Sequence, residues 1–351
     1  MKLPIPVEYE PMEAQVAKEI PVGGGWIYEP KWDGFRCLVF RDGSEVDLRS
    51  KASKPLARYF PEVVEVIQRL RTPRFVLDGE LVIPVEGAFL FDELLLRIHP
   101  AASRVKMLAS THPAHLVVFD LLVGESGVDL TGERLEERSR MLDDFAGRHL
   151  THESLYRSPR TSDVELARRW LAGELGGLDG VIAKRSDLPY KSGERTGMKK
   201  IKRLRTAECV VGGFRWSSAG RTIGSLLLGL YGEDGHLHHV GFCSSLNAKV
   251  RREADARVIP LQGGEGFDGR APGGPSRWRK KGTGDWEAVR PEVVVEVEYD
   301  HYSGGRFRHG TRFLRWRPDK APRQCRMEQI EREAASAIEI LEREISYGKQ
   351  T

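Results

Sequence analysis

The sequence predicts an α+β protein of two domains: residues 1–204 built mainly on antiparallel sheet, and residues 205–351 forming a smaller β domain. Three observations predict this architecture. The chain of 351 residues is too long for one ordinary core. Its first part alternates strands and helices without the repeating βαβ pattern of a dinucleotide-binding fold. Beyond residue 206 strands dominate, interrupted by one helical pattern.

The first domain begins with residues 1–24, whose proline and glycine content predicts an irregular lead-in. Apolar alternation and the Asp42-Gly43 turn predict an antiparallel meander over residues 25–51. Apolar residues at helical spacing predict helices at residues 55–70, 91–98, 133–145 and 163–175. Apolar runs and alternation predict strands at residues 75–83, 116–123, 181–185 and 200–203.

The second domain has a different pattern of predicted secondary structure, with one helix among several strands. The helix covers residues 248–258, and the strands cover residues 209–216, 225–231, 236–244 and 293–299. This pattern suits a small Greek-key barrel of the OB type, and a sandwich would explain the strands nearly as well. Residues 262–285 contain eight glycines and predict a surface loop. A charged amphipathic helix is predicted at residues 326–347.

Composition indicates a soluble globular protein, with 40% hydrophobic and 30% charged residues. There is no run of about 18 apolar residues, so we expect no membrane span. Residues 1–20 lack the basic-then-apolar pattern of a signal peptide. The cysteines are far apart and form no Cys-x-x-Cys pair, which argues against a zinc site or a disulfide framework: Cys37, Cys209, Cys243 and Cys325. A reducing cytoplasm is therefore expected. We also expect a monomer.

Positive charge is unevenly placed, although the net charge is only +4. One basic segment has Glu208 as its only acid and contains Lys199, Lys200, Lys202, Arg203, Arg205 and Arg215. A second has Asp319 as its only acid and contains Arg306, Arg308, Arg312, Arg315, Arg317, Lys320, Arg323 and Arg326. Solvated faces often look like this, but basic segments interleaved with aromatic residues favour a polyanionic partner.

One short stretch organises the chain: Glu29-Pro30-Lys31-Trp32-Asp33-Gly34-Phe35-Arg36. It places a lysine, a carboxylate, a glycine and an arginine between two predicted strands. A buried lysine at this position would require a compensating partner, because its ammonium group is costly to desolvate. Taken alone, the pattern is explained equally well by a hairpin lysine followed by an Asp-Gly turn.

Other segments also place acids and bases within apolar strands. They are Leu77-Asp78-Gly79-Glu80-Leu81-Val82, Val117-Val118-Phe119-Asp120-Leu121-Leu122, Asp179-Gly180-Val181-Ile182-Ala183-Lys184-Arg185 and Lys200-Ile201-Lys202. In the last, the alternation puts both ammonium groups on one face. Each segment alone could be a local ion pair. Together they would supply cations for a triphosphate, carboxylates for a metal and a ribose, and a ring for a base.

With these motifs in this order, the chain resembles the covalent nucleotidyltransferases, and specifically the ATP-dependent DNA ligases. The segments above match the family's successive elements, Arg49 matches its strand-following arginine, and residues 312–320 match the ligase version of the last element. The resemblance covers residues 29–320 and is closest to the compact stand-alone bacterial ligases of the ligase C type. It implies an adenylation domain followed by an OB-fold domain.

The resemblance also implies roles. Lys31 would carry AMP, Phe119 would stack on adenine, and Glu80 and Asp179 would bind Mg²⁺ or Mn²⁺. The other residues that would bind ATP are Glu29, Arg36, Glu80, Lys184, Lys200, Lys202, Arg317 and Lys320. Nicked or gapped duplex DNA would be bound by Asp33, Arg49, Lys51 and Arg203. Other repair proteins would be further partners. Two positions depart from the family pattern: Asp179 where glutamate is usual, and Met198 where an aromatic residue is common.

The lysine suits this chemistry because an amine attacking a phosphate forms a phosphoramidate that can later transfer the nucleotide. A free lysine has a pKa of about 10.4, so little neutral amine exists at pH 7. Arg36, Lys184, Lys202 and Mg²⁺ around Lys31 are expected to lower its pKa and favour the neutral amine.

Three alternatives explain part of the sequence. A capping-type guanylyltransferase shares the lysine chemistry, but residues 312–320 match the ligase form. An RNA ligase is not expected to carry the second domain. A non-catalytic nucleic-acid-binding module accounts for the basic segments and leaves Lys31, Glu80 and Lys184 without a role.

We expect nick binding to weaken steeply with salt, because only about thirty residues precede Lys31 and no separate DNA clamp is expected. Each phosphate-binding cation that a mutation removes should flatten the log–log slope by about 0.9. Equilibrium binding to a nicked duplex from low to physiological salt measures this slope. A nick affinity that salt leaves unchanged would contradict the expectation.

Overall fold

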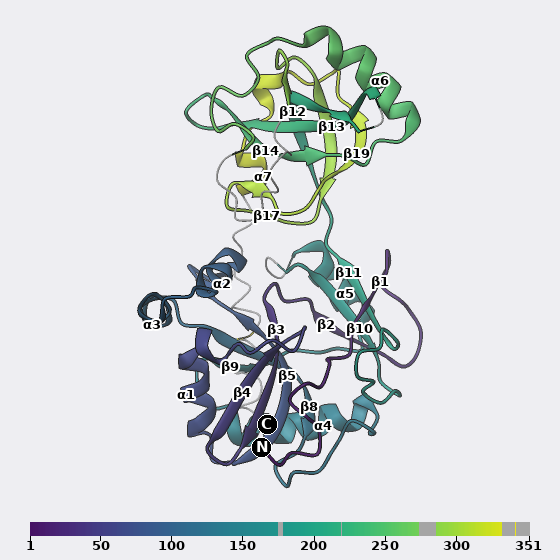
Figure 1. Cartoon of the computed structure of the whole chain (residues 1–351). Helices are drawn as coiled ribbons and strands as arrows, with labels where there is room; N and C mark the ends of the chain where they lie inside the picture. The colour runs from purple at the N-terminus through teal and green to yellow at the C-terminus, as the bar shows by residue number, and fades with distance from the viewer. Residues whose placement is uncertain (175–177, 219, 274–285, 332–340, 342–351) are drawn as a thin grey trace. The chain divides into compact units, whose positions relative to one another are not determined.

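The computed structural model describes residues 1–174, 178–218, 220–273, 286–331 and 341. Contacts divide the chain into two compact units, one built on Met1–Arg203 with Leu341, and the other on Leu204–Glu333. Both are α+β with mainly antiparallel sheet, which confirms the fold class (Figure 1). The functional domains at residues 1–204 and 205–351 stay a prediction.

A five-stranded sheet is the centre of the first unit. Its strands in spatial order are β4 (Glu45–Ser50), β3 (Phe35–Asp42), β5 (Arg74–Val82), β8 (His115–Val123) and β9 (Leu155–Arg157). Neighbouring strands are antiparallel except β8 and β9. The predicted meander forms β3 and β4 around Gly43, whose φ of 63° suits a glycine in the turn. Strand β9 was not predicted.

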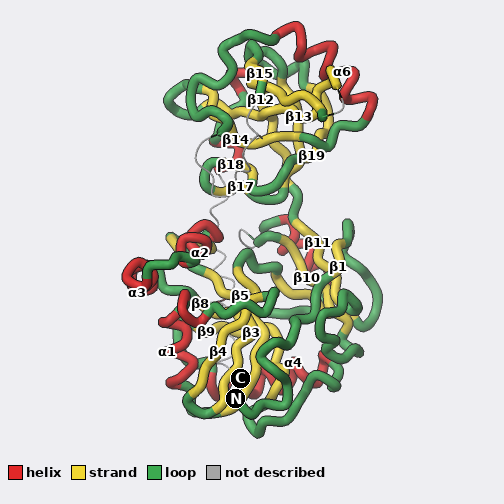
Figure 2. The backbone as a smooth tube through the Cα atoms, viewed as in Figure 1, coloured by secondary structure: helices red, strands yellow, loops and turns green. Residues whose placement is uncertain are grey.

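Helices cover one face of this sheet. The helical segments of the unit are η1 (Ala57–Tyr59), α1 (Pro61–Arg69), α2 (Phe91–Arg97), α3 (Ala102–Thr111), α4 (Leu135–His149) and α5 (Val164–Ala172). Ile67 of α1 and Phe145 of α4 are buried with Leu77 of β5 in one apolar cluster. Figure 2 shows α1 and α4 beside the strands of this sheet. Helix α3 was not predicted, and a short hairpin, β6 (Pro84–Val85) and β7 (Ala88–Phe89), precedes α2.

A second sheet of four strands lies in the same unit. Its spatial order is β1 (Gln15–Val16), β11 (Met198–Lys202), β10 (Gly180–Arg185) and β2 (Trp26–Pro30). Tyr28 and Val181 of this sheet are buried with Trp170 of α5 and with Val117 of the five-stranded sheet. The two sheets therefore share a core, and their edges can place side chains into one pocket. Strand β1 corrects the expectation that all of residues 1–24 are irregular.

The second unit is a six-stranded antiparallel sheet with an inserted helix. The strand order is β14 (Leu237–Cys243), β13 (Gly220–Tyr231), β12 (Arg205–Ser217), β16 (Val294–Tyr299) and β19 (Arg312–Trp316), with β15 (Glu287–Ala288) beside β12. The remaining elements are α6 (Ala248–Val258), η2 (Ile259–Leu261), β17 (Tyr302–Ser303), β18 (Arg306–Phe307), η3 (Pro322–Gln324) and α7 (Glu328–Glu331). The unit is OB-like, although β14 and β19 do not pair with each other among the described residues.

Several expectations fall partly outside the described residues. The predicted helix at residues 326–347 is represented by α7 and Leu341, and the predicted loop at residues 262–285 is described up to residue 273. Over the part of the chain that is described, we find no helix that combines the length and apolar character needed to cross a membrane.

Candidate active site

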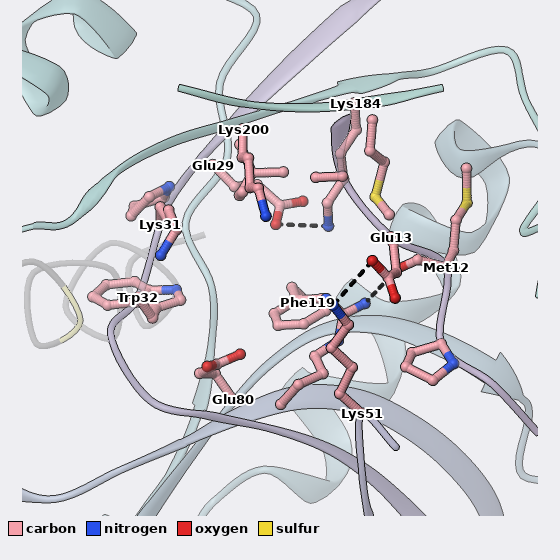
Figure 3. A pocket seen from close by; sticks show the side chains of 16 residues that line it. Met12, Glu13, Glu29, Lys31, Trp32, Lys51, Glu80, Phe119, Lys184 and Lys200 are labelled. Atoms are coloured by element: carbon pink, nitrogen blue, oxygen red, sulfur yellow. Dashed lines mark hydrogen bonds and ion pairs between the residues drawn. The ribbon is translucent and has the colours of Figure 1, made fainter. Parts of the chain in front are cut away.

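A pocket of about 230 Å³ in the first unit is lined by residues from both of its sheets. Its lining includes most of the residues that the sequence singled out: Glu29, Lys31, Arg36, Lys51, Glu80, Phe119, Lys184 and Lys200. Figure 3 shows the amines of Lys31, Lys184 and Lys200 pointing into the pocket around the ring of Phe119. Segments far apart in the sequence therefore supply one site.

Lys31 follows directly after β2, where backbone hydrogen bonds fix it beside residues 179–180. Its N–H donates to the Gly180 carbonyl at 2.9 Å, and the Asp179 N–H donates to the Lys31 carbonyl at 3.2 Å. Gly180 has φ of 146°, and a Cβ there would meet the Ile201 carbonyl oxygen at 2.0 Å. Glycine is therefore needed at position 180, and this close approach brings the Asp179 carboxylate to the Lys31 amine.

Lys31 Nζ donates to Asp179 Oδ2, and this ion pair sets the protonation of the lysine. Burial lowers the pKa of Lys31, but Asp179, with smaller effects from Asp33 and Glu80, outweighs burial and raises it. The protein's own charges therefore do not lower the Lys31 pKa as expected, and the expected contribution of Mg²⁺ stays a prediction. The effect of the carboxylates on the Lys31 pKa was underestimated, because the sequence did not show that Asp179 contacts the Lys31 amine.

Arg36 is held by a buried carboxylate on the neighbouring strand. Its Nε and Nη2 donate to the two oxygens of Asp78 at 2.5 and 2.6 Å, and Asp78 has no exposed surface. Tyr190 donates its hydroxyl to Asp78 at 2.6 Å and accepts the Met12 N–H at 2.9 Å. Arg36 also donates to the Met12 carbonyl at 3.3 Å. This network fixes the N-terminal segment against the pocket wall.

Phe119 reaches the pocket through an irregularity in β8. The pairing jumps from Asp78↔Asp120 to Gly79↔Val118, which leaves Phe119 as an extra residue in the strand. Such bulges turn side chains away from the regular alternation. The guanidinium carbon of Arg36 lies 4.5 Å from the ring centroid and the Lys184 amine 4.6 Å. Two cations thus lie over the ring and help to hold it in position.

Glu29 and Lys184 form a buried ion pair across β2 and β10, with 2.7 Å between the carboxylate and the amine. Burial raises the pKa of Glu29, and the Lys184 charge offsets only part of that effect. Asp120, whose charge also acts on Glu29, accepts two hydrogen bonds from Arg138, at 2.8 and 2.9 Å. The charged groups in and beside this part of the pocket are therefore paired with one another.

The mouth of the pocket gathers lysines. Burial, together with the charges of Lys51, Lys31 and Lys202, lowers the pKa of Lys200. Lys200 lines the pocket while the next residue, Ile201, is buried in the core, so the predicted alternation is present on β11. A cluster whose positive charges disfavour one another is suited to an anion such as a polyphosphate.

Glu80 is the pocket carboxylate best suited to a cation. Burial raises its pKa to about 7, and the charges of Arg36 and Lys31 do not compensate fully. Gly34 permits this packing, because a Cβ there would meet the Leu81 carbonyl at 2.1 Å and Glu80 Cγ at 2.7 Å. Oxygen donors from Glu80 and Asp179 have the chemistry that Mg²⁺ and Mn²⁺ prefer. Among the described residues no cluster of three acids, histidines or cysteines could hold a metal without further ligands.

Several predicted residues do not line the pocket. Arg49 pairs with Asp47 at 2.5 Å, and the Arg203 N–H donates to the Asp179 carbonyl at 3.0 Å. Asp33 and Lys202 affect pocket lysines through their charges without appearing in its lining.

Arg317 and Lys320 belong to the second unit, where both pair with Glu208. The Lys320 amine lies 2.7 Å from that carboxylate, and Arg317 also pairs with Asp319 at 2.8 Å. Both side chains are therefore held by acids of their own unit.

The pocket also contains residues that the sequence reasoning did not select. Met12, Glu13 and Ala14 line it, and Glu13 pairs with Lys51 at 2.9 Å. Trp32 lines it as well, donating its indole N–H to Ser158 at 3.0 Å. The position of Trp32 next to Lys31 was a usable signal. The N-terminal residues gave none, because their segment lacks a periodic pattern.

Comparisons with known proteins agree along the chain. A family model described as "ATP dependent DNA ligase domain" matches residues 11–202, and one described as "ATP dependent DNA ligase C terminal region" matches residues 219–320. DNA ligase C1 of Mycolicibacterium smegmatis is 44% identical over 345 residues, covering 94% of this chain and 96% of that protein. DNA ligase C of Mycobacterium tuberculosis is 42% identical over 355 residues, covering 95% and 96%.

A structure from work on Lig E DNA ligases has a similar fold, with a TM-score of 0.52 at 19% identity. The match covers 87% of this chain and 98% of the other. At this identity the likeness concerns the fold alone.

The raised pKa of Glu80 predicts a pH-dependent stability. The folded state keeps the proton up to about pH 7, whereas an unfolded glutamate loses it near its ordinary pKa of about 4.3. Folding stability should therefore fall as pH rises from about 4.3 to 7, by up to about 4 kcal/mol. Glu80→Gln should remove this loss. Urea unfolding at pH 5 and pH 8, with the exposed Glu65→Gln on α1 as control, measures it. Equal pH dependence in Glu80→Gln and the parent would contradict the assignment.

Proposed function

The chain belongs to the ATP-dependent DNA ligases, and from this premise we propose how its residues share the work of sealing a nick. As a DNA ligase it uses ATP to join a 5′-phosphate to a 3′-hydroxyl. The observation that carries the assignment of roles is the pocket: one lysine, Lys31, lies between a carboxylate that holds its amine and a cluster of lysines suited to a polyphosphate.

In the first step Lys31 Nζ attacks the α-phosphorus of ATP, forming a P–N bond as the bond to the β-phosphate oxygen breaks and pyrophosphate leaves. The amine must first lose a proton. Its hydrogen bond to Asp179 directs one of its N–H groups toward that carboxylate. In the second step a 5′-phosphate oxygen takes AMP from Lys31. In the third the 3′-hydroxyl attacks that phosphate, and AMP leaves.

The pocket's other residues position the nucleotide. The ring of Phe119 lines the pocket beside Arg36 and Lys184 and is suited to stack on adenine. Arg36 and Glu80 would bind the nucleotide on its ribose side, and Glu29 would bind near the adenine base. Lys184, Lys200 and Lys202 would neutralise the phosphates, because charge on the transferred group is stabilised by preorganised cations.

A divalent metal is proposed at Glu80 and Asp179, whose oxygens fit Mg²⁺ or Mn²⁺. When bound, the metal would supply positive charge to the phosphates. Asp179 is one methylene shorter than the glutamate usual in the family, and in this chain it also holds Lys31. Its proposed role therefore combines orienting the amine with carrying part of the metal site.

The second unit would contribute Arg317 and Lys320 to the same reaction. Both are held by Glu208, which accepts from two cations. We propose that they leave this carboxylate to orient the departing pyrophosphate, and that the domains at residues 1–204 and 205–351 move during the cycle.

Nicked or gapped duplex DNA is the proposed partner. The residues proposed to bind it are Asp33, Arg49, Lys51 and Arg203. We further propose a monomer that acts in cytoplasmic DNA repair together with other repair proteins. The ligase family models cover both parts of the chain, so an RNA ligase, a capping-type guanylyltransferase and a non-catalytic binding module are not favoured.

Changing Lys31 tests the central assignment. Lys31→Ala lacks the amine, and Lys31→Arg carries a group that does not deprotonate. Both should abolish the mass increase that ATP produces on the intact protein. Lys106→Ala, an exposed change on α3, serves as control and should form the adduct normally. The assignment would be overturned by normal adduct formation in either Lys31 variant.

Removing Arg317 or Lys320 tests whether the second unit serves one step. Arg317→Ala and Lys320→Ala should slow formation of the Lys31 adduct by about 100-fold or more, since cations on transferred phosphates act strongly. Both should seal a nick that already carries 5′-AMP at near-normal rate. Lys249→Ala on α6 is the control for loss of a surface charge. Equal loss of both activities would mean a structural or DNA-gripping role instead.

A further inference from the structure

The loop between β10 and β11 carries a buried tyrosine to which the proposed reaction gives no role. Tyr190 is 5% exposed, and its hydroxyl donates to Asp78 Oδ2 at 2.6 Å. The same hydroxyl accepts the Met12 N–H at 2.9 Å. Burial, followed by the charge of Asp78, raises the pKa of Tyr190 well above its usual range. The hydroxyl therefore keeps its proton and acts as donor and acceptor at once.

The surroundings of Tyr190 fix the place of this hydroxyl. The Tyr190 N–H donates to the Thr131 carbonyl at 2.9 Å. Its ring stacks on Tyr9 with 6.2 Å between centroids, and the guanidinium carbon of Arg138 lies 5.5 Å from the ring centroid. Contacts to the backbone and to the ring thus orient the side chain before any ligand binds.

Four residues form a closed ring of hydrogen bonds around one carboxylate oxygen. Tyr190 accepts the Met12 N–H, and Arg36 Nη2 donates to the Met12 carbonyl at 3.3 Å. Both Tyr190 and Arg36 Nη2 donate to Asp78 Oδ2, each at 2.6 Å. Both backbone polar groups of Met12 are therefore bound by side chains that share this oxygen. Buried networks in which every member has a partner are rigid.

Met12 belongs to a short segment, residues 11–14, which we call the N-terminal strap. All four residues line the nucleotide pocket, and Figure 3 shows Met12 and Glu13 at its wall. On the far side the Glu13 N–H donates to the Glu194 carbonyl at 2.9 Å, and β1 pairs with β11. The strap therefore reaches from the strand that carries Lys200 to the buried carboxylate, and the tyrosine hydroxyl fixes one of its ends.

Arg36 depends less on this hydroxyl than the strap does. Its Nε and Nη2 donate to the two oxygens of Asp78 at 2.5 and 2.6 Å, and neither bond involves Tyr190. Loss of the hydroxyl would keep both bonds, whereas the Met12 N–H would lose its acceptor. An unpaired buried donor is costly, so the strap would move or loosen first.

We propose that Tyr190 is a positioning residue for ATP, whose hydroxyl holds the N-terminal strap in place as one wall of the nucleotide pocket. The proposal rests on the proposed function, which places ATP in this pocket. A wall that is ordered before the nucleotide arrives lowers the entropic cost of binding. The strap would touch ATP before and during attack by Lys31 alike, so it should act on nucleotide binding and leave the chemical step unchanged.

Initial rates of Lys31 adduct formation over a range of ATP concentrations test this role. Tyr190→Phe keeps the ring and removes the hydroxyl. It should raise the KM for ATP about tenfold and change kcat by less than about twofold, because binding is weakened and the reacting groups are intact. Tyr28→Phe is the matched control, since Tyr28 is also buried and donates its hydroxyl to the Pro21 carbonyl at 2.7 Å. It should leave both constants as in the parent.

Hydrogen exchange at the Met12 amide gives a readout that does not depend on activity. In Tyr190→Phe this N–H should exchange about tenfold faster than in the parent, and in Tyr28→Phe at the parent rate. In the unmodified chain, formation of the Lys31 adduct should slow the same exchange, because AMP would then lie against the strap. Should Tyr190→Phe fail to fold, this comparison of the parent with and without its adduct decides the proposal.

Several results would overturn the positioning role. They are a parent-like KM in Tyr190→Phe, a loss confined to kcat, an equal rise of KM in Tyr28→Phe, or Met12 exchange that neither the variant nor the adduct alters. Absence of the adduct in the parent protein would instead overturn the proposed function, so the two failures are distinguishable.

Discussion

A fully buried carboxylate, Asp78, is the constraint around which the pocket is built. It lies in the middle of β5 with no exposed surface, so it is tolerable only with charged and hydrogen-bonding partners. Arg36 binds both its oxygens and Tyr190 donates a third hydrogen bond. Removing one member of such a group typically costs about 3–5 kcal/mol, because a buried charge is left unpaired. Tyr190 extends the network to Met12, so one carboxylate fastens β3, β5 and the N-terminal segment together.

The pocket's lysines follow a common rule. Lys31, Lys184 and Lys51 each have a carboxylate, whereas Lys200 lies among other cations. The ion pairs hold these three lysines in place, and the excess positive charge near Lys200 attracts an anion. In our proposal the triphosphate competes with these carboxylates for the lysines. The ion pairs therefore stabilise the pocket and also set the state from which the reaction begins.

The second unit separates its arginines in a similar way. Arg317 is held by Glu208, with Glu296 nearby at 3.4 Å, while Arg215 and Arg270 have buried nitrogens without partners among the described residues. Paired arginines need another cation or a movement before they can bind phosphate. The proposed nucleotide role thus falls on arginines that acids of their own unit hold in place.

The sequence by itself determined the α+β class, the two-part organisation and half of the residues that line the pocket. Local patterns carry that information: period-two alternation places Lys200 opposite Ile201, and Asp-Gly dipeptides mark close backbone approaches such as Gly34 on Leu81. Motif order then indicated the ligase chemistry. These signals act within a few residues, so they can be read before the chain is folded.

Only the tertiary structure decided which groups meet. Asp179 lies 148 positions from Lys31, and its contact reverses the expected effect on the pKa of the lysine. A bulge defined by pairing with β5 places Phe119, and Met12 enters the pocket from a segment with no pattern of its own. Strand register and ion-pair partners depend on long-range packing. Alternation along one strand specifies a face, but it does not specify what that face will meet.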